Sequence, residues 1–212
     1  DEKINEKLIP YTFRPVTIPS IEEDSYNTLK KDNQKQLIWG QTHSHTDFSI
    51  CQRRNDQNID LNYRFYQDVQ KADFGTVTDH AYNMWPIEQH INHKKADYYY
   101  FPGEFVAFPG YEWTGSKITH KGGPFGHVNP VLLEEEGTMN YYTPVDQNCK
   151  GSSLKELWKA YSEKNIITIP HHTANKQHYY NWDYYNKKME PIVEIFQDCR
   201  GQQEQPGVIG ST

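Results

Sequence analysis

Two histidines, His43 and His45, stand two positions apart in the stretch GQTHSHTDFS (residues 40–49), at the end of an apolar run typical of a strand. Side chains at positions i and i+2 of a strand point to the same face. Two imidazoles on one face of a rigid backbone can hold a metal ion. A polar loop that contains two histidines by chance is the alternative, and the rest of the chain decides between them.

Four later segments also place a reactive side chain in or at the end of an expected strand: Asp79 and His80 in TVTDHA, Glu112 in PGYEW, His127 in GHVNP, and His171 and His172 in TIPHH. Glu112 follows an apolar run that would bury its carboxylate, and a buried carboxylate needs a partner such as a metal ion. Neighbours on a strand point to opposite faces, so only one of the two adjacent histidines can face the centre, and we favour His171. Asp79 as a cap of the following helix and His127 as a hydrogen-bonded turn residue remain alternatives.

This set of side chains indicates a particular class of metal ion. A carboxylate among neutral imidazoles suits Zn²⁺, Mn²⁺ or Fe²⁺, whereas Mg²⁺ and Ca²⁺ prefer oxygen ligands. We expect two or three such ions, with Glu112 bridging two of them and a hydroxide held between them. That arrangement supplies a nucleophile at neutral pH and offsets the charge on a transferred phosphoryl group.

Seven apolar runs predict the strands that position these side chains: 36–45, 72–80, 104–113, 126–133, 165–172, 191–197 and 207–211. The run 59–72 places Leu61, Phe65 and Val69 on one face of a helix, a polar helix is expected at 86–98, and a capping box of Ser153 and Glu156 opens a third at 153–164. Alternating strands and helices favour an α/β fold with a largely parallel sheet. We expect one domain at 36–212, behind a polar, proline-punctuated leader at 1–35.

The composition excludes several classes of protein. The net charge of −6 disfavours a sequence-independent grip on a nucleic-acid polymer, and no apolar run is long enough to span a membrane. The three cysteines form no C-x-x-C pair, so neither a disulfide framework nor a zinc knuckle is expected. The cellular compartment stays open.

In this order, the motifs HSHTDFS, TDHA, PGYEWT, GHVN, IPHH and VEIFQ resemble the polymerase-and-histidinol-phosphatase (PHP) superfamily of metal-dependent phosphoesterases, and within it a branch that carries TDHA and GYEWT. The resemblance spans roughly residues 37–212. It implies a distorted seven-stranded (β/α) barrel, similar to a TIM barrel, with up to three metal ions at the carboxyl ends of the strands. It also favours a secreted or periplasmic protein.

The resemblance implies a role for each matching residue. His43 and His45 would bind the first ion, Glu112 would bridge to the second, and His127 and His171 would complete the second ion's shell. His80 matches a motif that serves a third ion, with Asp79 as a ligand or as a residue that orients His80.

The chain departs from the superfamily pattern in two places. Cys51 stands near the position of another histidine or acidic ligand in many members and could replace it. The final Asp-x-His motif would follow GVIGST, which ends at Thr212. The link DCRGQQEQP between the last two predicted strands is also shorter than a parallel crossover normally needs. We therefore expect residues to be missing near 203–206 and the natural chain to continue past 212.

These observations favour a metal-dependent phosphoesterase acting on a small-molecule phosphate ester, with Glu112 and Asp79 in the catalytic machinery. Arg200 is a candidate phosphate clamp, and a plain surface arginine is the alternative. The aromatic stretches ADYYYF and HYYNWDYYN suggest an alternative, a hydrolase of a sugar-derived substrate, although packing on the domain exterior also explains these tyrosines. A catalytically degenerate metal-binding module is the third possibility.

Overall fold

The computed structural model of the chain describes residues 37–49, 57–82, 84–115, 125–133, 153–173, 180–197 and 201–202. Internal contacts divide the chain into two units, Asp1–Ile38 and Trp39–Thr212, and the regular elements described below belong to the second. The predicted leader, residues 1–35, lies outside the described residues, as does the predicted strand 207–211.

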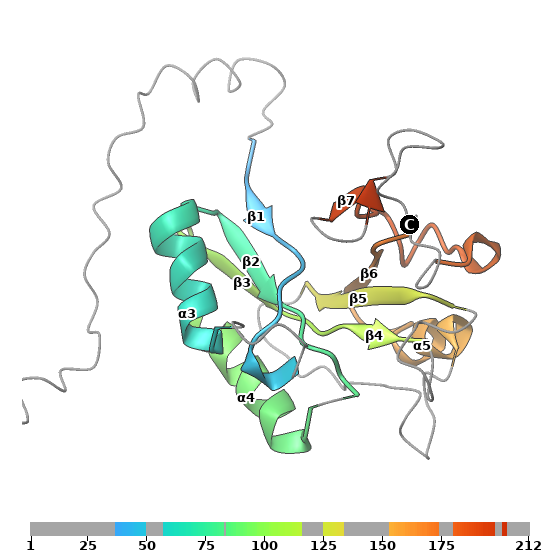
Figure 1. Ribbon diagram of the computed structural model, residues 1–212, viewed down its shortest axis with the longest axis horizontal. Coiled ribbons are helices and arrows are strands. Elements are labelled where there is room, and N and C mark those ends of the chain that lie inside the picture. Colours follow the sequence, from blue (N-terminus) through green and yellow to red (C-terminus); the bar gives the residue numbers. More distant parts are fainter. Residues whose placement is uncertain are drawn as a thin grey trace, which may run out of the picture. The chain divides into compact units, whose positions relative to one another are not determined.

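A parallel three-stranded sheet forms the first half of the second unit (Figure 1). Its strands are β1 (Gly40–Gln41), β2 (Phe74–Val77) and β3 (Val106–Pro109), in that spatial order. Helices α3 (Ile59–Arg64), continued by the π-helix η2 (Phe65–Gln70), and α4 (Pro86–Tyr99) pack against it. A short 3₁₀ turn, η1 (Asp47–Ser49), follows β1.

An antiparallel sheet forms the second half, with strands β4 (Trp113–Thr114), β5 (His127–Leu132) and β6 (Ile166–Pro170). Helix α5 (Leu154–Ala160) begins at Ser153, whose hydroxyl accepts a hydrogen bond from the Glu156 amide, as predicted from the capping box. Its predicted apolar face is buried: Leu154, Leu157, Trp158 and the following Tyr161. The 3₁₀ turn η3 (Trp182–Tyr184) and a hairpin of β7 (Phe196–Gln197) and β8 (Gly201–Gln202) complete the described elements.

One continuous segment joins the two sheets. Residues 106–109 pair with β2, and 113–114 pair with β5. Between them Gly110 forms a bridge with Val131, and Glu112 forms a bridge with His80. The single predicted strand 104–113 is therefore split between two sheets, and Glu112 lies where they meet.

The predicted seven-stranded (β/α) barrel is wrong. Among the described residues there are two separate three-stranded sheets, neither of which closes, and β4, β5 and β6 run antiparallel. Apolar runs locate strands but do not encode their direction, and the parallel barrel followed only from alternation and resemblance. The predicted strands 36–45 and 191–197 are also reduced, to Gly40–Gln41 and Phe196–Gln197.

The helix 59–72 turns a different face to the core than the spacing of Leu61, Phe65 and Val69 predicted. Leu61, Phe65 and Val69 are exposed, whereas Ile59, Tyr63 and Tyr66 are buried. The rings of Tyr63 and Tyr99 stack with centroids 4.9 Å apart. The buried tyrosine rings pack in the core and fix the orientation of the helix.

Candidate metal centre

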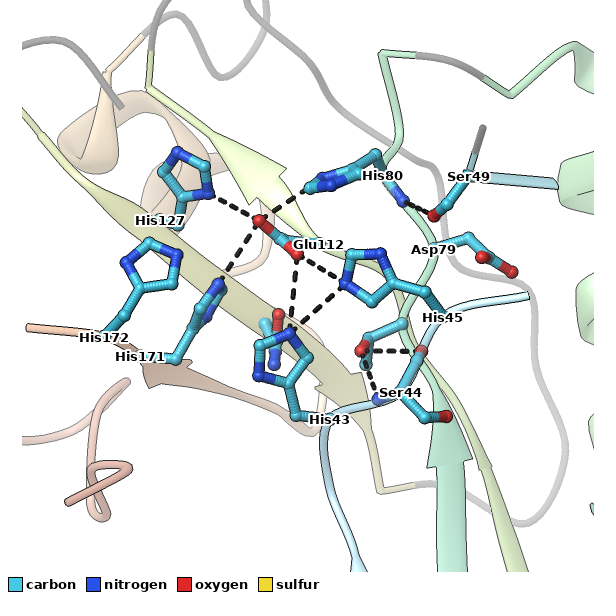
Figure 2. Close-up of polar contacts among 12 residues, drawn as sticks. His43, Ser44, His45, Ser49, Asp79, His80, Glu112, His127, His171 and His172 are labelled. Carbon is cyan, nitrogen blue, oxygen red and sulfur yellow. Dashed lines mark hydrogen bonds and ion pairs between the residues drawn. The ribbon is translucent and has the colours of Figure 1, made fainter. Parts of the chain in front are cut away.

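Glu112 lies at the centre of a cluster of histidines, as Figure 2 shows. Its side chain is 2% exposed. Its backbone amide donates to the carbonyl of Asp79 at 2.9 Å, and its carbonyl accepts from the Ala81 amide at 3.1 Å. These backbone bonds hold the carboxylate rigidly at the junction of the two sheets.

One carboxylate oxygen of Glu112, Oε2, faces the histidine pair that follows β1. It lies 2.8 Å from Nε2 of His45 and 3.5 Å from Nε2 of His43. The two Nε2 atoms are 3.3 Å apart, so both rings point to the same place, as the i, i+2 spacing predicts. Ser44, between them, is anchored by its carbonyl to the Thr78 amide at 2.8 Å and by its hydroxyl to the phenol of Tyr66.

The other oxygen, Oε1, faces three histidines from other segments. Nδ1 of His127 is 2.5 Å away, Nε2 of His171 is 3.2 Å away, and Nδ1 of His80 is 3.3 Å away. His127 is the first residue of β5, and His171 directly follows β6. The amide of His171 donates to the carbonyl of His127 at 3.4 Å. Antiparallel pairing thus brings the two rings to the same end of the second sheet.

His172 joins the cluster, although alternation predicted that it would point away. Its ring centroid is 4.3 Å from that of His171 and 4.7 Å from that of His127, and it is 6% exposed. The backbone at His172 has φ of 35°, a left-handed conformation that ends the strand geometry. The alternation rule therefore fails at this residue, because it holds only for extended backbone.

Glu194 is a second residue of the centre that the sequence analysis missed. Nδ1 of His43 donates to Oε2 of Glu194 at 2.8 Å, and the amide of Glu194 donates to the carbonyl of Pro170 at 3.0 Å. A carboxylate that accepts from one ring nitrogen orients the imidazole and leaves the other nitrogen for a metal. An acidic residue inside the apolar run PIVEIFQ, comparable to Glu112 in its own run, was the available signal.

The remaining predicted site residues lie apart from the cluster or outside the described part. The carboxylate of Asp79 accepts from the amide and the hydroxyl of Thr46, at 2.6 and 2.7 Å, and points away from Glu112 (Figure 2). Asp79 thus secures the segment that carries His45. Cys51 and Arg200 lie outside the described residues.

The protonation states of the cluster follow from burial and from its single central carboxylate. Burial acts to raise the pKa of Glu112, but the charges of His80 and His171 and the hydrogen bond from His127 hold it well below its usual range. Burial, aided by the charge of His43, lowers the pKa of His171 to about 4. Burial also acts to lower the pKa of His43, but hydrogen bonds to Glu112 and Glu194 raise it above its usual value. An ionised carboxylate and a neutral imidazole are the forms that bind metals.

The ligand atoms fall into two groups that share Glu112. His43, His45 and Glu112 form one group, and Glu112, His127, His171 and His172 form the other. Within each group all ligand atoms lie within 4.8 Å of one another. Among the described residues His80 belongs to neither group, although it contacts Glu112.

Comparison with known proteins gives a family and a distant relative. The chain is 22% identical over 170 residues to an uncharacterized protein of Chlamydia pneumoniae, an alignment that covers 78% of this chain and 25% of that protein. The chain thus spans about a quarter of the length of that curated relative. None of the helices in the described ranges has the length and apolarity needed to cross a bilayer.

The expected membership of the PHP superfamily is wrong. The family that matches is DUF3604, described as a protein of unknown function, over residues 68–211. The resemblance rested on short motifs with histidine or glutamate at strand ends, and different folds can place such residues together. The chain belongs to the DUF3604 family.

Proposed function

We propose that the protein is a metal-dependent hydrolase acting on phosphate esters, with two divalent transition-metal ions held around Glu112. One observation carries the proposal: the two oxygens of this buried carboxylate face two different sets of histidines. A carboxylate placed in this way can bridge two ions. Phosphatases, nucleases and aminopeptidases use such pairs of metal ions in catalysis.

The donor atoms of the cluster also favour a bound cation. Five histidines lie within 3.5 Å of Glu112, and in the neutral state each imidazole has a lone pair that a metal ion can accept. Nδ1 of His171, a fully buried residue, has no hydrogen-bond partner in the described part of the chain. Buried polar groups without partners are unfavourable unless something else binds in the cluster.

The ligand types favour Zn²⁺, Mn²⁺ or Fe²⁺, because imidazole suits these ions and a mostly nitrogen shell does not suit Mg²⁺ or Ca²⁺. Such ions lower the pKa of coordinated water and offset negative charge on a phosphoryl group. The chain's own residues would position the ions. Glu112 would lie between the two ligand groups, Glu194 would orient His43, and Asp79 would fix the backbone of Thr46.

A hydrolase of a sugar-derived substrate is the second candidate. Trp182 and Tyr185 are 48% and 49% exposed, and their ring centroids lie 6.1 Å apart. Neighbouring exposed aromatic rings can stack on the apolar face of a sugar. In the other tyrosine-rich stretch, Tyr99 is buried against Tyr63, so it serves the core.

A phosphate-release assay tests the proposal. The purified chain is stripped with a chelator, reloaded with Zn²⁺, Mn²⁺ or Fe²⁺, and assayed with p-nitrophenyl phosphate and bis(p-nitrophenyl) phosphate. We expect metal-dependent release of p-nitrophenol that Glu112→Gln abolishes together with metal binding. Glu104→Gln, at an exposed turn residue, is the matched control and should match the unmodified chain.

Two outcomes contradict the proposal. Metal bound without hydrolysis of either ester, but with binding of sugars that Trp182→Ala removes, would favour the carbohydrate candidate. Metal bound with neither activity nor sugar binding would leave a metal-binding module without catalysis.

A further inference from the structure

His172 occupies a backbone conformation that a side chain with a Cβ rarely adopts. Its φ of 35° lies in the left-handed region, which favours glycine. An extended backbone would send the rings of His171 and His172 to opposite faces. The turn instead brings both rings into the cluster, so the unfavourable conformation has a clear geometric result. Strained residues of this kind gather at functional sites.

The group that contains His172 is complete and closed. Glu112, His127, His171 and His172 are all between 0% and 6% exposed, and their ligand atoms lie within 4.8 Å of one another. Four protein ligands fill the tetrahedral shell that Zn²⁺ adopts in structural sites and leave no position for water.

The group on the other side of Glu112 is incomplete. It has three protein ligands, Glu112, His43 and His45, and the two histidine side chains are 10% and 17% exposed. Three ligands and an accessible face are the pattern of sites that keep a position for water or substrate. Glu194, whose side chain is 17% exposed, accepts a hydrogen bond from Nδ1 of His43 and so orients its ring.

We infer that the cluster comprises two unequal metal sites: a closed site of Glu112, His127, His171 and His172 that retains its ion, and an open site of Glu112, His43 and His45 that exchanges its ion and meets the substrate. His172 is a ligand of the closed site. The inference rests on the metal binding in the proposed function and extends it by assigning a different role to each ion.

Metal titration tests this division without relying on activity. The stripped chain is titrated with Zn²⁺ in the calorimeter and with Co²⁺ in the spectrophotometer, because tetrahedral Co²⁺ absorbs visible light far more strongly than five- or six-coordinate Co²⁺. We expect two equivalents in two steps, with the closed site binding first and giving the intense spectrum. We expect the second equivalent to bind at least about tenfold more weakly, because the open site offers one protein ligand fewer.

His172→Gly is the decisive variant, because glycine adopts the left-handed backbone without strain and so favours folding. It should weaken the tight step by at least about tenfold and change the Co²⁺ spectrum of the first equivalent, since losing a ligand affects affinity no less than losing its outer-shell partner. His172→Asn, which also tolerates this backbone, checks that the loss follows the imidazole. His45→Ala should instead remove the weak step alone. His90→Ala, on the exposed face of α4, should change neither.

The possible outcomes separate this inference from the proposed function. Unchanged tight binding and spectrum in both His172 variants, or a single equivalent in the unmodified chain, would overturn the two-site division even if esters are hydrolysed. Two unequal steps with the expected variant effects would uphold it even if no ester is hydrolysed. An absence of binding would overturn both.

Discussion

Glu190 is a buried carboxylate whose charge should destabilise the fold at neutral pH. It is 1% exposed and accepts hydrogen bonds from the Tyr180 hydroxyl at 2.8 Å and from the Asn186 amide at 2.9 Å. Burial raises the pKa of Glu190 from 4.5 to about 7, although the two hydrogen bonds act in the opposite direction. Between these two pKa values, Glu190 keeps its proton in the folded chain and releases it in the unfolded chain.

The sign and size of the effect follow from this difference. Between pH 4.5 and 7 the folded state binds more protons at Glu190 than the unfolded state, so the free energy of unfolding falls as the pH rises. The shift corresponds to about 3 kcal/mol in total, of which about 2.5 kcal/mol develops between pH 5 and pH 8. Glu190→Gln removes the charge and keeps the shape. Its amide oxygen can accept from Asn186, and its NH₂ can donate to the Tyr180 hydroxyl.

Urea unfolding at pH 5 and pH 8 measures this effect. Relative to the unmodified chain, we expect Glu190→Gln to gain about 2.5 kcal/mol between the two pH values, because other titrating groups cancel in the difference. Glu163→Gln, at an exposed residue, is the control and should show no such gain. If the free-energy difference between Glu190→Gln and the unmodified chain is the same at both pH values, the reasoning about Glu190 is wrong.

Three further substitutions test the supports of the cluster. Glu194→Gln should lower metal affinity at the open site by about 10- to 100-fold in calorimetry, because it weakens the group that orients a ligand; an unchanged affinity would refute this. Asp79→Asn should lower the free energy of unfolding in urea by about 1–3 kcal/mol, because a neutral amide replaces the carboxylate that accepts both hydrogen bonds from Thr46. Gly75→Ala should also destabilise by about 1–3 kcal/mol, because its Cβ would lie 2.6 Å from Cδ2 of Tyr66; an unchanged unfolding midpoint would argue against close packing there.

Local patterns in the sequence predicted the histidine pair well. The spacing of His43 and His45 indicated that they would converge, and both Nε2 atoms point toward Glu112, although the two residues follow β1 and do not lie in it. The capping box at Ser153 is likewise local. Features that depend on a few neighbouring residues could therefore be predicted.

Features that depend on long-range pairing or on one unusual dihedral angle could not be predicted. Strand direction in the second sheet depends on which segments meet, and apolar runs do not encode that. His172 was expected to point away because the rule for strands does not anticipate a left-handed residue at the strand's end. Tyr63 and Tyr66 were overlooked because Leu61, Phe65 and Val69, at spacing four, were used to orient their helix.

The position of Glu112 at the junction of the two sheets affects how the folded chain resists proteolysis. Its histidine partners come from segments after β1, after β2, at β5 and after β6, so an ion bound there would cross-link parts that are far apart in sequence. Closing such long loops is entropically unfavourable, and an ion that binds only the folded chain offsets this. Metal supply would then set how often the junction opens to a protease, so the lifetime of the protein would follow the availability of the ion.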